Sequence, residues 1–140
     1  MKQIIRFCVF ALMVICFSCE GKKWLVNCGD CFEDEPLDAV VSIKLRDIQT
    51  PVTINIYDGD LEDNVPYDSF QASGTEFTAS TGLNKKFTFT ATYNIGGKVY
   101  IAVDATIPRV KYEEDLCDYP CYYVYDNVVD LRLRNTISGK

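Results

Sequence analysis

The sequence contains no histidine, although it is 140 residues long. Histidine is the base of Ser-His-Asp and Cys-His hydrolytic sites and a ligand in many zinc sites, so these arrangements are excluded. Any enzyme would have to use carboxylates, tyrosines or thiols. A glycosidase needs two carboxylates at a set separation across a cleft, and nothing in the sequence indicates such a cleft. The carboxylates that could be considered for this chemistry are Asp104, Glu113, Glu114 and Asp130. We therefore expect no enzymatic activity and no cofactor.

Basic residues are also scarce. The chain has 14 Lys and Arg against 20 Asp and Glu, a formal net charge of −6, and the basic residues form no cluster. An acidic surface repels phosphate backbones, so we expect no nucleic-acid partner. Beyond residue 38 the sequence shows no convincing helical period and no apolar run of membrane-spanning length.

The N-terminal segment has the pattern of an export signal. Two basic residues, Lys2 and Arg6, precede an uncharged run of 11 residues from Phe7 to Phe17. The run has the length of a signal-peptide core and is too short to cross a bilayer as a stable helix. We predict that residues 1–18 are removed, which leaves Cys19 as the new N-terminus.

The junction Ser18-Cys19 resembles the lipobox of bacterial lipoproteins, with Cys16 where that family prefers Leu. In those proteins the cysteine sulfur is lipidated and the upstream peptide is removed. The resemblance implies that acyl chains such as palmitate on Cys19 attach the protein to a membrane. The expected location is the cell envelope, lipid-anchored at the outer membrane, on its periplasmic or its external face.

Four more cysteines form two clusters, Cys28 and Cys31 in CGDC and Cys117 and Cys121 in CDYPC. An even number in an exported domain of this size is typical of two disulfides, for which there are three connectivities. Pairing between the clusters is favoured over pairing within them, because loops of roughly 90 residues each contribute about 4 kcal/mol in the chain-entropy model. A thioredoxin-type redox pair in CGDC and a Cys₄ zinc site are the alternatives.

From Asp38 onward apolar residues recur with a period of two, which indicates strands with one buried face. The clearest feature is a hairpin whose turn is Ile95-Gly96-Gly97-Lys98. The pattern predicts an all-β domain, a two-sheet antiparallel β-sandwich of about seven strands. The expected organisation is a signal peptide (1–18), an N-terminal tether (19–36) and the sandwich (37–137). The expected strands are 39–46, 52–57, 67–72, 77–79, 87–93, 99–104 and 122–134.

Two runs in this domain, PVTINIYDG and KKFTFTATYNIGGKVYIAVDA, precede a final apolar strand. Together they resemble a transthyretin-like or carboxypeptidase-regulatory-type sandwich over residues 38–135, and an immunoglobulin-like sandwich is the alternative. With its lipobox, the chain is similar to small uncharacterised lipoproteins of Gram-negative envelopes. The resemblance implies an accessory, adhesion or ligand-presenting module and no chemistry.

Five of the nine tyrosines gather near the C-terminus. Exposed aromatic side chains on a rigid sheet suit stacking on sugars or anchoring a protein partner, whereas alternate tyrosines can also fill the edge of a core. Glu113-Glu114-Asp115 keeps the region acidic, which favours a basic or neutral partner. The candidate binding surface is Tyr112, Tyr119, Tyr122, Tyr123 and Tyr125.

An acidic segment between two predicted strands is a weak calcium candidate. It places four carboxylates in seven residues but lacks the spacing and the terminal glutamate of an EF-hand loop. A solvated turn is the favoured interpretation. The four residues are Asp58, Asp60, Glu62 and Asp63.

These features predict a membrane-anchored envelope lipoprotein that acts as a non-enzymatic binding or assembly module. Its partner would be an envelope protein or a glycan. The alternatives are a carbohydrate-binding accessory module and a thiol-disulfide redox protein.

Overall fold

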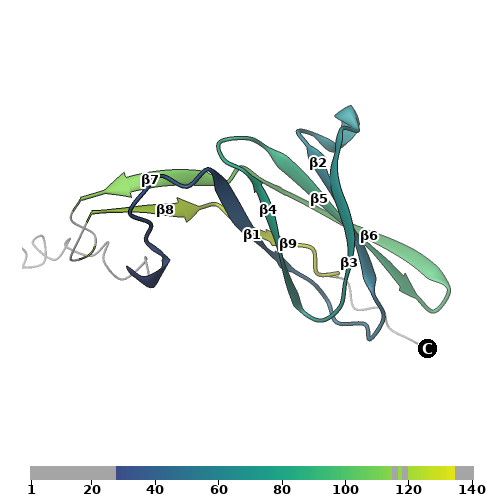
Figure 1. Ribbon diagram of the computed structural model, residues 1–140. Helices are drawn as coiled ribbons and strands as arrows, with labels where there is room; N and C mark the ends of the chain where they lie inside the picture. The colour runs from purple at the N-terminus through teal and green to yellow at the C-terminus, as the bar shows by residue number, and fades with distance from the viewer. Residues whose placement is uncertain (1–27, 115–116, 118–119, 135–140) are drawn as a thin grey trace, which may run out of the picture.

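A computed structural model describes residues 28–114, 117 and 120–134 (Figure 1). The predicted signal peptide and Cys19 lie outside the described residues. Within them no helix is long and apolar enough to span a membrane. The elements are η1 (Cys28–Asp30), β1 (Asp38–Lys44), β2 (Val52–Asp58), η2 (Leu61–Asp63), β3 (Pro66–Ala72), β4 (Glu76–Gly82), β5 (Phe87–Ile95), β6 (Lys98–Thr106), β7 (Arg109–Glu113), β8 (Cys121–Tyr125) and β9 (Val128–Asp130).

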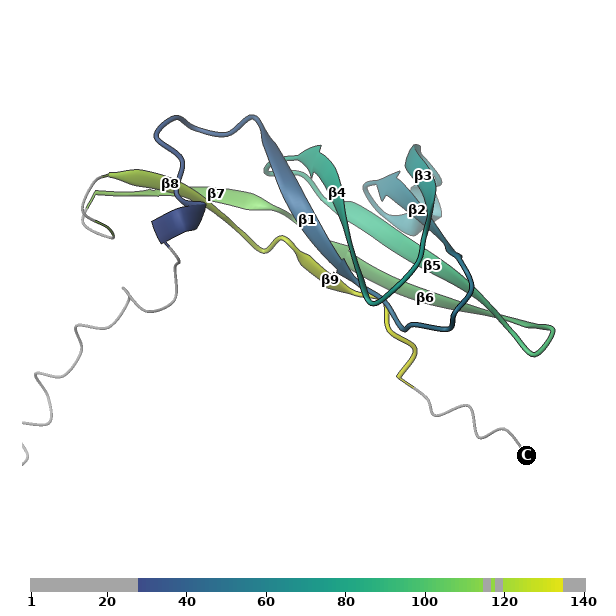
Figure 2. The same ribbon diagram turned by 60° about the horizontal axis from the view of Figure 1, so that its bottom comes forward.

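The all-β class is confirmed, and the expected number of about seven strands is corrected to nine among the described residues. Two sheets pack face to face in a sandwich-like body, with strand orders β4-β1-β9 and β3-β2-β5-β6. A separate two-stranded ribbon, β7-β8, extends away from this body in both views (Figures 1 and 2). The pairing is antiparallel except between β1 and β9, which are parallel. The body is therefore not the purely antiparallel pair of sheets that the sequence predicts.

The core lies between the two sheets and follows from the two-residue period. Val41 and Ile43 of β1 face Ile54 and Ile56 of β2 across the body, all fully buried. Strand β5 runs through the middle of the larger sheet and buries Phe87, Phe89, Ala91 and Tyr93 in the same cluster. Each large side chain removed from water contributes about 1.5–3 kcal/mol, so this layer is the main source of stability.

Tyr93 joins the two sheets through its hydroxyl group. The hydroxyl donates to the carbonyl of Leu131 at 2.8 Å and accepts from the backbone N–H of Arg46 at 3.1 Å. Burial away from water raises the pKa of Tyr93, because the phenolate would lose its hydration. The neutral hydroxyl thus satisfies two backbone groups at the end of the core.

The predicted hairpin between β5 and β6 is present. Ile95 pairs with Lys98, and Gly96 and Gly97 have φ values of 57° and 76°. Positive φ at both central residues is the requirement of a type I′ turn, which glycine meets without strain. The turn fixes the register of the whole β5-β6 pair.

Two strand expectations fail at the other end of the molecule. The expected single strand over 122–134 is divided into β8 and β9, because Asp126 takes a left-handed conformation with φ of 54°. Strand β7 has no predicted counterpart, although its sequence RVKYE places Val110 and Tyr112 between charged residues with a period of two. The first error lies where the chain passes from the ribbon into the body, and the second lies in the ribbon.

Candidate functional site

The ribbon is assembled from segments that are distant in the sequence. Strand β7 follows β6 after only two residues, and β8 precedes β9, so the ribbon is rooted in the body by both strands. On the outer edge of β8, Phe32 and Tyr122 exchange two backbone hydrogen bonds of 2.9 Å. The chain just after CGDC therefore adds a third, very short strand to the ribbon.

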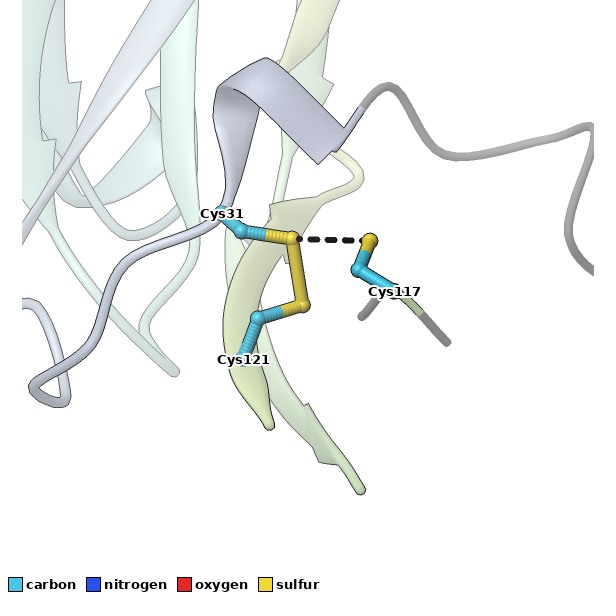
Figure 3. Close-up of side chains that lie close together, drawn as sticks. All are labelled: Cys31, Cys117 and Cys121. Carbon is cyan, nitrogen blue, oxygen red and sulfur yellow. Dashed lines mark hydrogen bonds between the residues drawn. A yellow bond between two sulfur atoms is a disulfide. The ribbon is translucent and has the colours of Figure 1, made fainter. Parts of the chain in front are cut away.

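Two disulfides hold this N-terminal segment on the ribbon. Cys28 pairs with Cys117 and Cys31 with Cys121, with Cα atoms 5.9 and 5.2 Å apart. Both bonds connect the two clusters, and the Cys28–Cys31 pair that thioredoxin-type chemistry needs is not formed. Figure 3 shows the Cys31–Cys121 bond beside the sulfur of Cys117. Residues 28–36, expected as part of a tether, begin with a segment fastened to β8.

The energetic roles of the two disulfides differ in a testable way. The bonds span 89 and 90 residues, so either one alone removes about 4 kcal/mol of unfolded-state entropy in the chain model. Once one bond is present, the second closes only the short loop between neighbouring cysteines. The pair is therefore partly redundant for stability, and the second bond chiefly fixes local geometry.

The cysteine sulfurs are also the one group of three potential metal ligands that converges among the described residues. The sulfurs of Cys31, Cys117 and Cys121 lie within 4.8 Å of one another, and Cys31 Sγ is 3.5 Å from Cys117 Sγ. Zinc binds thiolates, and sulfurs joined in disulfides have none to offer. The zinc alternative from the sequence thus requires the same four residues in their reduced form.

One face of the ribbon carries a line of aromatic side chains. Tyr112 and Tyr122 are directly opposite each other in the β7-β8 pair, with ring centroids 4.8 Å apart and planes inclined by 44°. Phe32 is opposite Tyr122 on its other side. Residues directly opposite one another share a face, so Phe32, Tyr122 and Tyr112 form an aromatic row across three strands. Phe32 is 48% exposed and Tyr112 45%.

The other face of the ribbon mixes aromatic and basic residues. Tyr123 and Tyr125 lie there with ring centroids 6.2 Å apart, opposite Lys111 and Arg109. A hydrogen bond to Glu113, with which Lys111 forms an ion pair, raises the pKa of Lys111. The structure therefore divides the predicted tyrosine surface between two faces.

Tyr119 lies outside the described residues. Phe32 was missed by sequence reasoning, and its position one residue after the CGDC cluster is the signal that could have indicated it.

A cleft of about 420 Å³ lies at the root of the ribbon, where β6 passes into β7. Thr106, Arg109 and Asp126 are among its lining residues. Thr106 also hydrogen-bonds to the backbone carbonyl of Asp126, which ties the two strands together there. The cleft is continuous with the basic-aromatic face, since Arg109 belongs to both.

The predicted calcium segment forms ion pairs with neighbouring lysines. Asp58 pairs with Lys85 and Asp60 pairs with Lys86, and the hydrogen bond to Asp60 raises the pKa of Lys86. Glu62 and Asp63 lie in η2 on the surface. Within the described residues these four carboxylates form no converging group of three.

The four carboxylates considered for catalysis lie in two places, Asp104 beside Asp130 in the body and Glu113 with Glu114 at the ribbon. Asp104 accepts the backbone N–H of Asp130 at 2.8 Å, and Asp130 receives two side-chain hydrogen bonds from Arg132. The Arg132 guanidinium holds the pKa of Asp130 well below its usual range, so this carboxyl stays ionised. Glu113 and Glu114 lie on the ribbon, where Glu113 pairs with Lys111.

Comparison of the chain with protein-family models, with curated proteins and with solved structures finds no match. The functional argument therefore depends on the geometry of the site itself.

Proposed function

We propose that this chain is a lipid-anchored protein of the cell envelope that acts as a non-enzymatic binding or assembly module. It contacts a protein partner through the aromatic row of Phe32, Tyr122 and Tyr112. The observation that carries the proposal is that these side chains are displayed on a ribbon outside the core, braced by two disulfides.

The ribbon has little reason to exist for stability alone. A two-stranded ribbon is marginally stable in water without further packing, and within β7 and β8 only Cys121 is fully buried. The disulfides hold it in one conformation, which lowers the entropy lost when a partner binds. Large aromatic side chains at fixed positions are the groups that most often dominate binding at protein interfaces.

The shape of the row favours a protein over a glycan. The rings of Tyr112 and Tyr122 are inclined by 44°, so they form a ridge and not a flat platform. A ridge fits a groove of a protein surface, whereas stacking on sugars needs an aromatic face that is open and flat. Glu33, Asp34 and Glu35 directly follow Phe32 and are exposed, so a basic or neutral partner is expected.

The proposed anchor rests on the sequence of residues 1–19. An acylated Cys19 would tether the ribbon to the bilayer by a short segment, because Cys28 and Cys31, nine and twelve residues after Cys19, are bonded to Cys117 and to Cys121 of β8. Confinement to a membrane raises the effective concentration of the domain for neighbours there. The lipid would thus increase the occupancy of a weak contact.

A cross-linking pull-down from intact envelopes tests the site. The full-length chain with both Tyr112→Ala and Tyr122→Ala should recover its partner about tenfold less well or worse, because two central ring contacts are lost. The matched control is Tyr123→Ala with Tyr125→Ala, which removes the same groups from the opposite face. Equal recovery by all three proteins would exclude the aromatic row as the binding site.

Two further measurements separate the components of the proposal. Metabolic labelling with palmitate should label the wild-type chain and not Cys19→Ala. An unlabelled wild type would contradict the proposed lipid anchor but not the proposed binding site on the ribbon. Trp24 fluorescence with envelope glycans tests the carbohydrate-binding alternative. A saturable change that Tyr122→Ala abolishes would assign the row to sugars instead of a protein.

A further inference from the structure

The four-stranded sheet has two edge strands, β3 and β6, and they are built very differently. Strand β3 begins at Pro66, pairs with β2 through a register shift at Ile56/Tyr57, and exposes Asp68, Ser69 and Gln71. Proline, irregular pairing and polar side chains are the features by which edge strands avoid pairing with other chains. Strand β6 instead exposes Val99, Ile101 and Val103, at 62%, 62% and 52%.

The backbone of this part of β6 is also free to pair. Ile95 and Lys98 flank the type I′ turn and exchange hydrogen bonds, so bonding to β5 continues at every second residue, Tyr100 and Ala102. The N–H and C=O groups of Val99, Ile101 and Val103 therefore point away from β5. Among the described residues, no backbone hydrogen bond outside the β5-β6 ladder involves these three.

This open stretch has defined ends. On one side it stops at the turn. On the other, the side chain of Asp104 accepts the N–H of Ala105 at 2.9 Å and the N–H of Asp130 at 2.8 Å, which closes the edge next to β9. The segment from Val99 to Val103 is thus a row of five residues whose centre is Ile101.

We propose that a second copy of this chain pairs with β6 in antiparallel orientation, about a two-fold axis at Ile101. In this register Ile101 is opposite Ile101 of the other copy, Val99 is opposite Val103, and Lys98 is opposite Asp104. The apolar side chains meet on one face, and opposite charges meet at both ends on the other. This complementarity is what singles out a second copy as the occupant. The pairing joins two four-stranded sheets into one and is independent of the function proposed for the ribbon.

Sedimentation velocity of the full-length chain over a concentration series tests the pairing. The wild type should form a dimer, and I101K should raise the dimer dissociation constant at least about tenfold, because two lysines then face each other on the axis. V40K is the matched control, since Val40 has a similar exposed fraction, 60%, and lies on β1, the central strand of the other sheet. A monomeric wild type, or a dimer that I101K does not weaken, overturns the proposal.

Two further variants keep the test independent of folding defects and check the register. I101P removes an N–H that makes no bond within the chain, so it should abolish the dimer while a circular dichroism spectrum stays that of the wild type. I101C should give a reducible covalent dimer, because residues opposite each other in a hydrogen-bonded antiparallel pair have Cα atoms about 5.5 Å apart, within disulfide range. V40C should give none. Cross-linking through V40C but not I101C would exclude this register.

Discussion

The sandwich-like body and the β7-β8 ribbon show two different ways of holding strands together. In the body, alternate residues of β1, β2 and β5 are buried in a shared apolar layer. In the ribbon only Cys121 is fully buried among the described strand residues. Strands β7 and β8 are joined by their backbone ladder and one cross-strand aromatic pair, and two disulfides fasten the N-terminal segment to them. Burial acts in any redox condition, whereas the attachment of the N-terminal segment to the ribbon depends on oxidation. The two regions therefore differ in what holds them, a shared buried layer in one and a backbone ladder with covalent cross-links in the other.

The largest effect is expected from a cavity in the body. Phe89→Ala removes a fully buried ring from the centre of β5 and should lower the free energy of unfolding by about 3–5 kcal/mol. Urea denaturation followed by far-ultraviolet circular dichroism measures it. Tyr123→Ala on the ribbon is the matched control, which also removes an aromatic ring, and it should lower the free energy of unfolding by much less. Similar losses from the two variants would contradict the division between body and ribbon.

The disulfides are expected to act non-additively. Removing both pairs with Cys→Ser at all four positions should cost more than the ~4 kcal/mol of a single long loop, because the smaller contribution of the second bond is lost as well. Removing only Cys28–Cys117 or only Cys31–Cys121 should cost less than half of that, since the other bond still closes a loop of about the same length. The measurement is the denaturation midpoint of the three variants, with alkylation mass spectrometry to count free thiols. Two single-pair losses that add up to the total would contradict the redundancy.

A smaller effect is expected from the hydroxyl that joins the sheets. Tyr93→Phe leaves the Arg46 N–H and the Leu131 carbonyl without this partner and should cost about 1–3 kcal/mol at neutral pH.

The same substitution has a pH signature. Burial raises the pKa of Tyr93 in the folded state, so the unfolded chain ionises first. The stability from this group is fully present below the ordinary tyrosine pKa of about 10 and is lost as the pH rises above it. The difference in the free energy of unfolding between wild type and Tyr93→Phe should therefore become smaller above that pH. A difference in the free energy of unfolding that becomes larger would show that Tyr93 ionises readily in the folded protein.

The smallest effect is expected at Thr81 of β4. Its side chain is fully buried, and its hydroxyl is without a hydrogen-bond partner among the described residues. Thr81→Val replaces an unsatisfied polar group by a methyl group and should stabilise the body by up to about 1 kcal/mol. Exposed Thr78 on the same strand is the control, where the same change should have almost no effect. Destabilisation by Thr81→Val would mean that the hydroxyl is satisfied in solution.

The body could be predicted from the sequence because its strands obey a local rule. Alternation in 39–46 and 87–93, and the glycine pair at 96–97, correspond to β1, β5 and the β5-β6 turn. The parallel pairing of β9 with β1 could not be predicted in this way, because it joins segments far apart in the sequence and no local pattern specifies a partner.

The candidate site was less predictable for a related reason. Strand β7 has no buried face, since its residues are all exposed or half-buried, and its short alternation of Val110 and Tyr112 with charged residues is too brief to be distinctive. The tyrosine density indicated the region, yet which tyrosines share a face depends on the register of β7 against β8. Phe32 joins the row through a pairing across 90 residues, for which the cysteine clusters gave the only hint.

The nearly straight path from β6 into β7 places the turn of the β5-β6 hairpin and the ribbon at opposite ends of the molecule (Figures 1 and 2). A two-fold axis at Ile101 would reverse this polarity in the second copy. The two aromatic ridges would then stand at the far poles of an elongated rod, facing outward. Such an object could not hold one partner molecule from both sides, but it could bridge two of them.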